Sequence, residues 1–500
     1  MQKIAFAGTD GRTLLSALVI STATSDIHTE EFKGVVIRGT PCMPKYVEIM
    51  NWPVEFIATK SNAAKDYCET IIAAFKAGTI DVVIPMPEAL LFEGLVDAVE
   101  EAGFGDHIVG LSESGAFIEG DKIECKKLCR DAGIPVASSW SEVDAKDYQR
   151  ILSTCLSYIH KYGGAVLKYP YSAGGKGARI ILNSWQIKDV YDTLIKDYKD
   201  SYKKLFGGKG KWPLLIESLM SGVEISFTIL VDKIGNFQIL PTAMDYPERF
   251  EGPGSKENPI TGGMGAVSPH PLETPQLMKM AGDVIAVPLI QKMKELGILR
   301  PCVLYPGCFV SLDGKMHPTD IRVSEINIRP GEPEAQPVIR RLRNLGPLIK
   351  ATLEGRLNEI EPEVRSDQLA MCCALVTGPG GPDGQKGYPW SCTKGEPVEI
   401  DFKYMKRKGI QIIPSAMTCS PDDGSFKSDG TRVAFMNANV TVKPDQKRGD
   451  VADRFRNKLL AAFNNGKIRV IPREDSQGNR LDLRRDIGFH YLEAEKIFPD

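Results

Sequence analysis

The first twenty-two residues already restrict the fold of this chain. An apolar run at residues 3–8 stops at a Gly-Thr-Asp-Gly turn, and residues 13–22 have the pattern of a helix. A strand, a glycine turn and a helix in this order are typical of a doubly wound α/β domain with a parallel sheet. The alternation continues with expected strands at 34–37, 80–85 and 107–110 and expected helices at 63–77 and 90–102.

The length of 500 residues exceeds what one hydrophobic core holds, so we expect about three or four domains. Further helices are expected at 122–132, 148–162, 184–198, 275–296, 337–354 and 450–464, and residues 202–212 are expected to form a loop. The predicted fold is a mixed α/β and α+β multidomain protein. Its predicted parts are an N-terminal α/β substrate domain (1–118), a central domain (119–136 and 220–360), a lid (137–219) and a C-terminal α+β domain (361–500).

Composition narrows the function classes. The formal charge is −2 and 25% of residues are charged, so no basic footprint for nucleic acid or an anionic membrane is expected. No apolar stretch approaches the roughly 18 residues of a membrane span, and the N-terminus resembles a buried strand more than a secretory signal. Eleven scattered cysteines without a CxxC pair favour free thiols in the cytoplasm, and six isolated histidines give zinc catalysis little support.

A glycine-rich turn follows the expected strand at 164–168. The strand delivers Lys168, and the turn contains Gly174, Gly175, Lys176 and Gly177. Glycines let a row of backbone N–H groups point at one site, where they bind phosphate oxygens, and lysines add charge. The alternative is a flexible hairpin with two solvent lysines. The chain has no Walker-type phosphate loop, so a nucleotide site would be of another kind.

Two acidic segments follow. Glu217 and Glu224 lie at the end of one expected strand and the start of the next, where they could meet an adenine edge and a ribose diol while Leu219 and Met220 cover the ring. Exposed edge carboxylates would give the same pattern.

In the expected strand at 321–327, Glu325 and Asn327 point to one face and offer hard oxygen ligands for Mg²⁺. Arg329 follows on that face and could hold an anionic substrate. A solvent-facing polar strand is the alternative, which the apolar run at 302–310 disfavours.

A fourth segment lies late in an irregular stretch, residues 244–271. It consists of Thr261, Gly262, Gly263, Met264 and Gly265. Three glycines in four positions indicate close approach of the backbone to another group, or a hinge. A purely structural loop is the rival interpretation.

In this order and spacing, the four segments resemble the ATP-grasp superfamily, and within it the phosphoribosylamine–glycine ligase family. The resemblance covers roughly residues 1–350. It rests on Pro87-Glu88-Ala89, Glu119-Gly120-Asp121-Lys122, the loop 173–177, TGGMGA at 261–266, the set Glu325/Asn327/Arg329 and residues 331–336, and it is fainter near 387–389, 429–433 and 484–488.

The resemblance implies an ADP-forming ligase that joins glycine to 5-phosphoribosylamine through an acyl phosphate, with ATP and Mg²⁺ (Mn²⁺ as an alternative). It matches Lys122, Lys168 and Lys176 to nucleotide phosphates, Glu217 and Glu224 to adenine and ribose, and Glu325 with Asn327 to the metal. It matches the substrates and the acyl phosphate to Gly11, Arg12, Glu88, Asp245, Arg329 and residues 261–265. The turn at 174–177 corresponds to a mobile lid element, and no residue is expected to form a covalent intermediate.

The sequence departs from the family pattern near the amine substrate. The first turn reads GTDGRTLL instead of GNGGREHA, and RPGEPE stands at 329–334 instead of RFGDPE. The departures leave open a related ligase that acts on a different amine or amino acid. A nucleotide-binding protein without catalysis is a third hypothesis, against which the Glu325/Asn327 pair argues.

Overall fold

The structure is a computed structural model of the chain. It describes all residues except 23–30, 172–176, 208–209, 253, 255–256, 380–385, 393, 421–422, 472–479 and 490–500.

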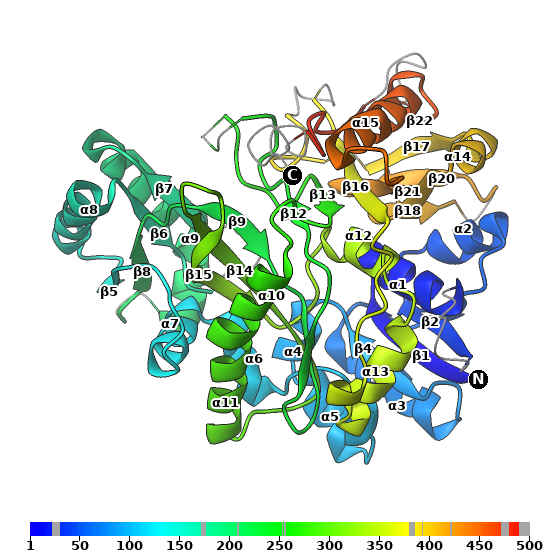
Figure 1. Cartoon of the computed structure of the whole chain (residues 1–500), viewed down its shortest axis with the longest axis horizontal. Coiled ribbons are helices and arrows are strands. Elements are labelled where there is room, and N and C mark those ends of the chain that lie inside the picture. Colours follow the sequence, from blue (N-terminus) through cyan, green and yellow to red (C-terminus); the bar gives the residue numbers. More distant parts are fainter. Residues whose placement is uncertain are drawn as a thin grey trace.

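The N-terminal part is a parallel four-stranded sheet with the order β3-β2-β1-β4, covered by helices (Figure 1). The strands are β1 (Gln2–Gly8), β2 (Phe32–Arg38), β3 (Glu55–Ile57) and β4 (Val82–Pro85). Helix α1 (Gly11–Thr22) crosses β2 so closely that a Cβ on Gly34 would lie 1.9 Å from the carbonyl oxygen of Ala17. The predicted doubly wound α/β start is confirmed.

Several elements of this part differ from the sequence-based expectation. The helix expected at 90–102 is two helices, α4 (Glu88–Phe92) and α5 (Leu95–Glu101), because Gly94 adopts a left-handed φ of +73°. The strand expected at 107–110 is reduced to a single bridge between Val83 and Ile108. Helices α2 (Met43–Met50) and α6 (Glu113–Gly120) and strand β3 were not expected, whereas α3 (Ala64–Lys76) and α7 (Lys122–Asp131) were.

Residues 140–218, which fall within the predicted lid and are called the lid below, project at the left of Figure 1. Its antiparallel sheet has the order β5-β8-β6-β7, with β5 (Trp140–Asp144), β6 (Ala165–Lys168), β7 (Ala178–Ile181) and β8 (Pro213–Ser218). Helix α8 (Tyr148–Tyr162) and helix α9 (Ile187–Phe206), which follows the short helix η2 (Ser184–Gln186), cover one face. Since α9 runs to Phe206, the expected loop at 202–212 is wrong in its first half.

The central sheet has the order β11-β10-β14-β15, and β9 also pairs with β14. Its strands are β9 (Val223–Ser226), β10 (Ile229–Val231), β11 (Phe237–Ile239), β14 (Cys302–Leu312) and β15 (Pro318–Asn327). The helix expected at 275–296 is α10 (Pro275–Ala281) and α11 (Val287–Glu295), separated by a π-helical turn, Gly282–Ala286.

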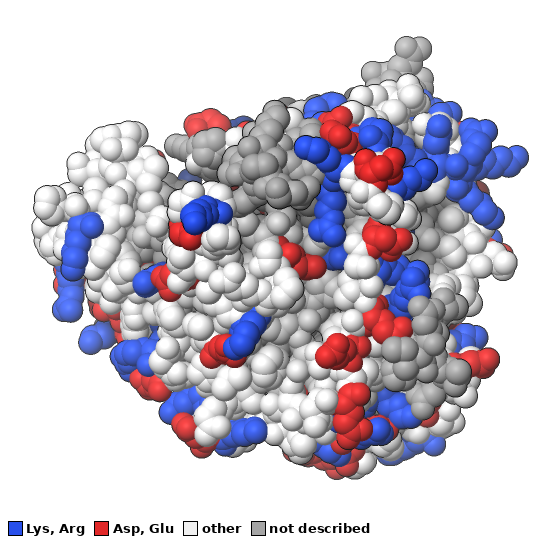
Figure 2. Space-filling model, in the orientation of Figure 1, with Lys and Arg blue, Asp and Glu red and all other residues white. Residues whose placement is uncertain are grey.

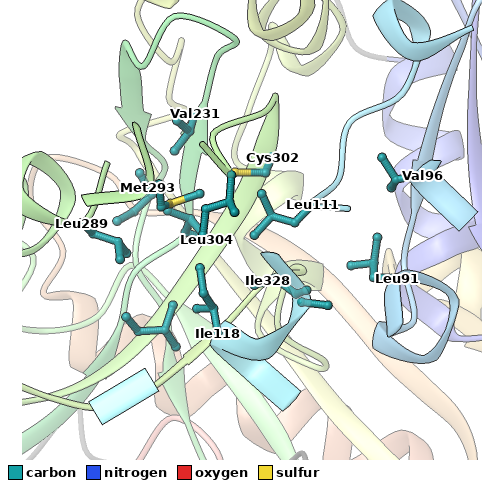
Figure 3. Packing of buried hydrophobic residues seen from close by; sticks show 14 of the residues in the cluster. Leu91, Val96, Leu111, Ile118, Val231, Leu289, Met293, Cys302, Leu304 and Ile328 are labelled. Atoms are coloured by element: carbon teal, nitrogen blue, oxygen red, sulfur yellow. The ribbon is translucent and has the colours of Figure 1, made fainter. Parts of the chain in front are cut away.

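One hydrophobic cluster joins the central part to the N-terminal part. Leu289 and Met293 of α11 pack with Leu304 of β14, and the same cluster reaches Leu91 and Val96 in α4 and α5. Leu111 and Ile328 lie between these two groups in Figure 3. The two parts are therefore held against each other by a shared core.

The C-terminal part contains two antiparallel sheets. The first has the order β12-β13-β16-β21-β18, with β23 also on β16, and it begins with two strands from the irregular stretch, β12 (Met244–Asp245) and β13 (Gly265–Ser268). Its other strands are β16 (Gln368–Thr377), β18 (Gln411–Pro414), β21 (Arg432–Thr441) and β23 (Leu481–Asp482). The segment that carries Asp245 and residues 261–265 is thus tied to the C-terminal sheet.

The remaining C-terminal elements complete the fold. The second sheet has the order β19-β20-β17-β22, with β17 (Lys394–Ile400), β19 (Met417–Cys419), β20 (Phe426–Asp429) and β22 (Ile468–Val470). The helix expected at 337–354 is α12 (Ala335–Arg340) and α13 (Leu345–Glu354), followed by η4 (Leu357–Glu359); α14 (Phe402–Lys408) and α15 (Arg448–Asn464) lie farther along.

On the face drawn in Figure 2, acidic and basic residues are mixed, and neither charge dominates. The exception is a group of Lys and Arg residues at the upper right, near α14 in Figure 1. Within the described part of the chain, no helix is both long and apolar enough to cross a membrane.

Candidate functional site

A buried ion-pair triad connects the lid to the central part. Glu217, at the end of β8, is 1% exposed and lies 2.5 Å from Lys168 Nζ and 2.7 Å from Lys126 Nζ. Lys168 also donates to Ser324 Oγ on β15 at 3.3 Å. Burial alone would raise the pKa of Glu217, but the charges of Lys126 and Lys168 outweigh it and lower that pKa to about 2. Glu217 is therefore ionised and holds two ammonium groups in place.

Beside the triad, β15 presents Glu325 and Asn327 on one face. Lys122 Nζ lies 3.4 Å from Glu325 Oε2, and the Asn327 amide nitrogen donates to the carbonyl of Tyr305 at 3.3 Å. That contact leaves the Asn327 amide oxygen free to accept a ligand. Burial would raise the pKa of Glu325, but Lys122, Lys168 and Arg329 outweigh it, and the net shift is downward.

These residues fit a divalent cation bound together with a polyphosphate. Lys122, Glu325 and Asn327 line one cavity, with Glu119 and Ser324 on its wall. Two hard oxygen donors are too few for a cation held by protein alone, and the described residues contain no group of three His, Cys, Asp or Glu side chains able to hold a metal. Mg²⁺ typically takes one or two protein oxygens and completes its shell with phosphate oxygens and water.

The lid sheet turns an apolar face toward the same side as Lys168. Alternate residues Ala165, Leu167 and Ile181 pack into the lid core, so Val166, Lys168 and Ile180 point to the opposite face. Val166 pairs in register with both Ile180 and Glu217, and Ile180 is 46% exposed. Sequence reasoning missed Val166 and Ile180. Since side chains alternate along a strand, placing Lys168 on the ligand face already places Val166 there.

The predicted ring-covering pair and the predicted turn lie at the ends of these strands. A Cβ on Gly164 would lie 2.9 Å from Leu219 Cδ2, so Leu219 packs across the start of β6, and Met220 follows it in the chain. Gly174, Gly175 and Lys176 lie outside the described residues. Gly177 is buried, and its carbonyl accepts from the backbone N–H of Tyr169 at 2.9 Å.

Arg329 lies between two carboxylates from the N-terminal side. Its guanidinium is 3.3 Å from Glu88 Oε2 and 3.2 Å from Glu119 Oε1, and Glu119 also accepts the backbone N–H of Ile328 at 2.8 Å. Burial alone would raise the pKa of Glu88, but Arg329 leaves it lowered, whereas for Glu119 burial prevails and the pKa is raised. Glu88 and Arg329, predicted separately, are thus brought together.

Arg12 is already engaged by protein groups. Its Nε donates to Asp10 Oδ2 at 3.0 Å, it lies 4.0 Å from Glu332, and it also donates to the carbonyl of Pro330. Asp10 in turn accepts from the backbone N–H of Thr13 at 3.0 Å and so caps α1 with its own carboxylate. The N-terminus of α1, where helices commonly bind anions, is occupied by this side chain.

The loop at 261–265 is tightly packed. Gly263 has φ +95°, and a Cβ there would lie 2.3 Å from Pro333 Cδ and 3.3 Å from Asp245 Oδ1; a Cβ on Gly265 would lie 2.5 Å from the carbonyl of Cys372. Met264 is fully buried. Thr261 Oγ1 also donates to the carbonyl of Pro247 at 2.8 Å, and the Gly262 N–H donates to Tyr388 OH at 3.0 Å. Elsewhere, Gly11 approaches Gln336, Phe435 and Ile413.

Replacing Gly263 by alanine tests this packing. The new Cβ would meet a proline ring and stand at a positive φ, so we expect a loss of roughly 2 kcal/mol or more in the free energy of unfolding. Gly262→Ala is the matched control, because its Cβ would meet its nearest neighbour at 3.5 Å, an ordinary contact. Chemical denaturation compares the two; equal stability of both variants would contradict the packing argument.

Glu224 and Asp245 line a second cavity, whose wall is formed by β9, β12, the loop after β12 and residues 484 and 486. Desolvation within the cavity, followed by the charges of Glu248, Glu325 and Glu334, raises the pKa of Glu224 to about 7, although part of the residue is exposed to solvent. Burial, followed by Glu334 and Glu224, raises the pKa of Asp245 well above its usual range. This acidic cavity suits hydroxyl or ammonium groups of a ligand.

Comparison with known proteins adds the family. The model of the phosphoribosylglycinamide synthetase ATP-grasp (A) domain matches residues 120–335. Two curated phosphoribosylamine–glycine ligases are each 30% identical to this chain. The match to the enzyme of Rhodopirellula baltica covers 74% of this chain and 78% of that enzyme, and the match to the enzyme of Nostoc sp. covers 82% of this chain and 84% of that enzyme.

Solved structures share the fold. The phosphoribosylamine–glycine ligase of Thermotoga maritima matches with a TM-score of 0.68 and 19% identity, over 97% of this chain and all of that one. A second match, with a TM-score of 0.60 and 16% identity, is the biotin carboxylase domain of the Hydrogenobacter thermophilus 2-oxoglutarate carboxylase, which was solved with MgADP and bicarbonate. It covers the whole of this chain and 99% of that one. By the identity and coverage of its curated relatives, the chain belongs to the phosphoribosylamine–glycine ligase family.

Proposed function

We propose that this enzyme ligates glycine to 5-phosphoribosylamine at the expense of ATP, giving glycinamide ribonucleotide, ADP and phosphate in purine synthesis. The observation that carries the proposal is the convergence of Lys168, Lys122 and Glu325 from the lid, α7 and β15 on one site. Cations and a hard-oxygen pair at one place are what a triphosphate with its metal requires.

The nucleotide would lie between the lid and β15. Lys122 and Lys168 would contact its phosphates, Lys176 would add charge from the turn, and Glu325 with Asn327 would hold Mg²⁺ or, less commonly, Mn²⁺. Glu224 would accept the ribose hydroxyls. For Glu217 we now propose a different role from direct adenine contact, because both of its oxygens face lysines: it positions Lys126 and Lys168.

The first step would be attack of the glycine carboxylate oxygen on the γ-phosphorus, which breaks the bond to the β-phosphate and releases ADP. The amine then attacks the acyl carbon and phosphate leaves with the bonding electrons, while the amine loses a proton. A bound divalent cation supplies charge neutralisation for the phosphates. The lysines, Arg329 and the loop at 261–265 would orient the reactants, and the lid would exclude the water that hydrolyses acyl phosphates.

The adenine ring would rest on the apolar lid face formed by Val166, Ile180, Leu219 and Met220. We therefore expect Ile180→Ala to raise the Kd for ATP about 5- to 30-fold, from the lost apolar contact of one side chain. Isothermal titration calorimetry measures the change. Ile234→Ala, at a residue that is 58% exposed, is the control that should leave Kd unchanged; equal effects of both would contradict the assignment.

A release assay tests the function. ADP and glycinamide ribonucleotide should appear only when glycine, 5-phosphoribosylamine and ATP are all present, with the product identified by mass spectrometry. A second candidate, the same chemistry on a different amine or amino acid, is favoured by one observation: Arg12 is held by Asp10 and Glu332 instead of being open to a substrate. Turnover of another amine with none of phosphoribosylamine would select that candidate.

We also propose the domain division 1–118, 119–136 with 220–360, 137–219 and 361–500, with the first three parts forming substrate, ATP-grasp central and lid domains. A cytoplasmic location is proposed as well, and the eleven cysteines, all without a disulfide, support a reducing compartment.

A further inference from the structure

The loop after β12 and the segment after β23 are joined by two ion pairs that run in opposite directions. Arg484 donates to the Glu248 carboxylate at 3.0 Å and to the Glu248 carbonyl at 3.1 Å. In return, Arg249 donates to the Asp482 carboxylate at 2.7 Å. The two arginine side chains are 4% and 1% exposed. Because each buried guanidinium is paired with a carboxylate of the other segment, each pair fixes one segment against the other.

The guanidinium of Arg484 has a fixed orientation. It donates twice to the Asp486 carboxylate, at 2.6 and 2.8 Å. The Arg484 guanidinium also lies over the ring of Tyr246, 5.1 Å from the ring centre. The Tyr246 hydroxyl also accepts from the backbone N–H of Gly488 at 2.8 Å. The C-terminal segment is thus hydrogen-bonded to both Tyr246 and Glu248. The neighbouring Arg485, in contrast, is exposed, and within the described part of the chain it donates to Asn464 alone, at 3.3 Å.

Both segments form the wall of the acidic cavity, which has a volume of about 390 Å³. Among the described residues, its wall carries the carboxylates of Glu224, Asp245, Glu248 and Asp486 and one cation, Arg484. Arg484 is saturated by Glu248 and Asp486, so it does not offer a free charge to a ligand. Its effect on the cavity comes from where it holds the residues beside Asp245.

We propose that Arg484 is a positioning residue for the substrate held at Asp245, so that the C-terminal segment completes the substrate side of the active site. The inference rests on the proposed function. Asp245 lies one residue from Tyr246 and three from Glu248, the two residues that the C-terminal segment grips. The phosphate-side residues Lys168 and Glu325 belong to other elements, β6 and β15. Among the described residues, Arg484 contacts Glu248, Asp486 and Tyr246 but not Glu224, the wall residue that we assign to the ribose of ATP. Its effect should therefore fall on the non-nucleotide substrates more than on ATP.

The test is Arg484→Gln, which removes the charge and keeps the length. The KM for glycine or for phosphoribosylamine should rise about 10- to 100-fold, the cost of a misplaced binding group, while the KM for ATP stays within about 2-fold. Arg484→Lys keeps the charge and should recover part of the loss, and Arg485→Gln is the matched control with wild-type constants. Equal rises in all three KM values, or no rise, would overturn the proposal.

A second measurement is independent of turnover. In Arg484→Gln, backbone hydrogen exchange should become faster at residues 244–249 and stay unchanged at residues 223–226. Unchanged exchange at 244–249 would show that Arg484 does not hold this loop in place. If Arg484→Gln does not fold, Tyr246→Phe, which removes one acceptor, should raise the same KM less strongly, and an unmoved KM counts against the proposal. Absence of wild-type turnover rejects the proposed function; wild-type turnover without the selective shift rejects the role of Arg484.

Discussion

Glu325→Gln is expected to lower kcat for ADP formation by at least about 10³-fold, the scale of losing a group that neutralises transition-state charge. Glu325 is one of two hard oxygen donors on the face of β15, and Lys122, Lys168 and Arg329 keep it ionised. An amide in its place is a weaker ligand for a divalent cation and no longer balances Lys122. The measurement is a coupled ADP assay at saturating ATP, glycine and amine.

The matched control is Asp320→Asn on the same strand. Asp320 is partly exposed and pairs with Arg322 at 2.7 Å, away from the cavity. This variant should keep wild-type kcat, and both proteins should retain the wild-type circular dichroism spectrum. ADP formation by Glu325→Gln at a rate near that of the control would remove Glu325 from the metal site.

The second large effect concerns stability. Glu217→Gln is expected to destabilise the protein by about 3–5 kcal/mol, because it leaves Lys126 and Lys168 buried without a counter-charge. ATP affinity should fall with it, since Lys168 loses the carboxylate that positions it. Denaturant unfolding and calorimetric ATP titration measure the two changes.

An exposed triad of the same residue types, one glutamate and two lysines, is the matched control. Glu55 also lies between two lysines, 2.8 Å from Lys3 and 2.7 Å from Lys33, but its side chain is 40% exposed. Glu55→Gln should cost less than about 1 kcal/mol, as surface ion pairs do. Equal losses in the two variants would show that burial of the triad does not matter.

The pH dependence has a defined sign. The folded-state pKa of Glu217 is lowered to about 2, below its value of 4.5 in the unfolded chain. The stability it contributes is therefore fully present above pH 4.5 and is lost as the pH falls toward 2. Glu217→Gln should flatten the acid limb of the stability curve in that window.

The sequence was sufficient where a periodic pattern ran without interruption. The helix expected at 148–162 is α8 at those bounds, and alternation along 321–327 placed Glu325 and Asn327 on one face of β15. The break between α4 and α5 was missed because the apolar pattern continues across Gly94. Strands β12 and β13 have two and four residues, too few for a period. β12 pairs with β13, and the next partner of β13 is β16, which lies about a hundred residues farther along the chain.

At the candidate site, long-range ion pairs set the limit of sequence reasoning. Lys126 was missed although its i,i+4 spacing from Lys122 puts both on one helical face. Nothing local shows that Glu217 would meet it from another element. Likewise, the match of Arg12 to the family pattern predicted an arginine available to the substrate. Its guanidinium is instead paired with two carboxylates, that of Asp10 nearby in the sequence and that of Glu332 far along the chain.

The most direct measurement is a crystal structure of this protein with a non-hydrolysable ATP analogue and Mg²⁺. The proposed account predicts one nucleotide whose phosphates contact Lys122 and Lys168, and a metal that takes oxygens of Glu325 and Asn327 at about 2.1 Å together with phosphate oxygens. A nucleotide bound elsewhere, or phosphates at Lys168 with a metal that avoids β15, would contradict it.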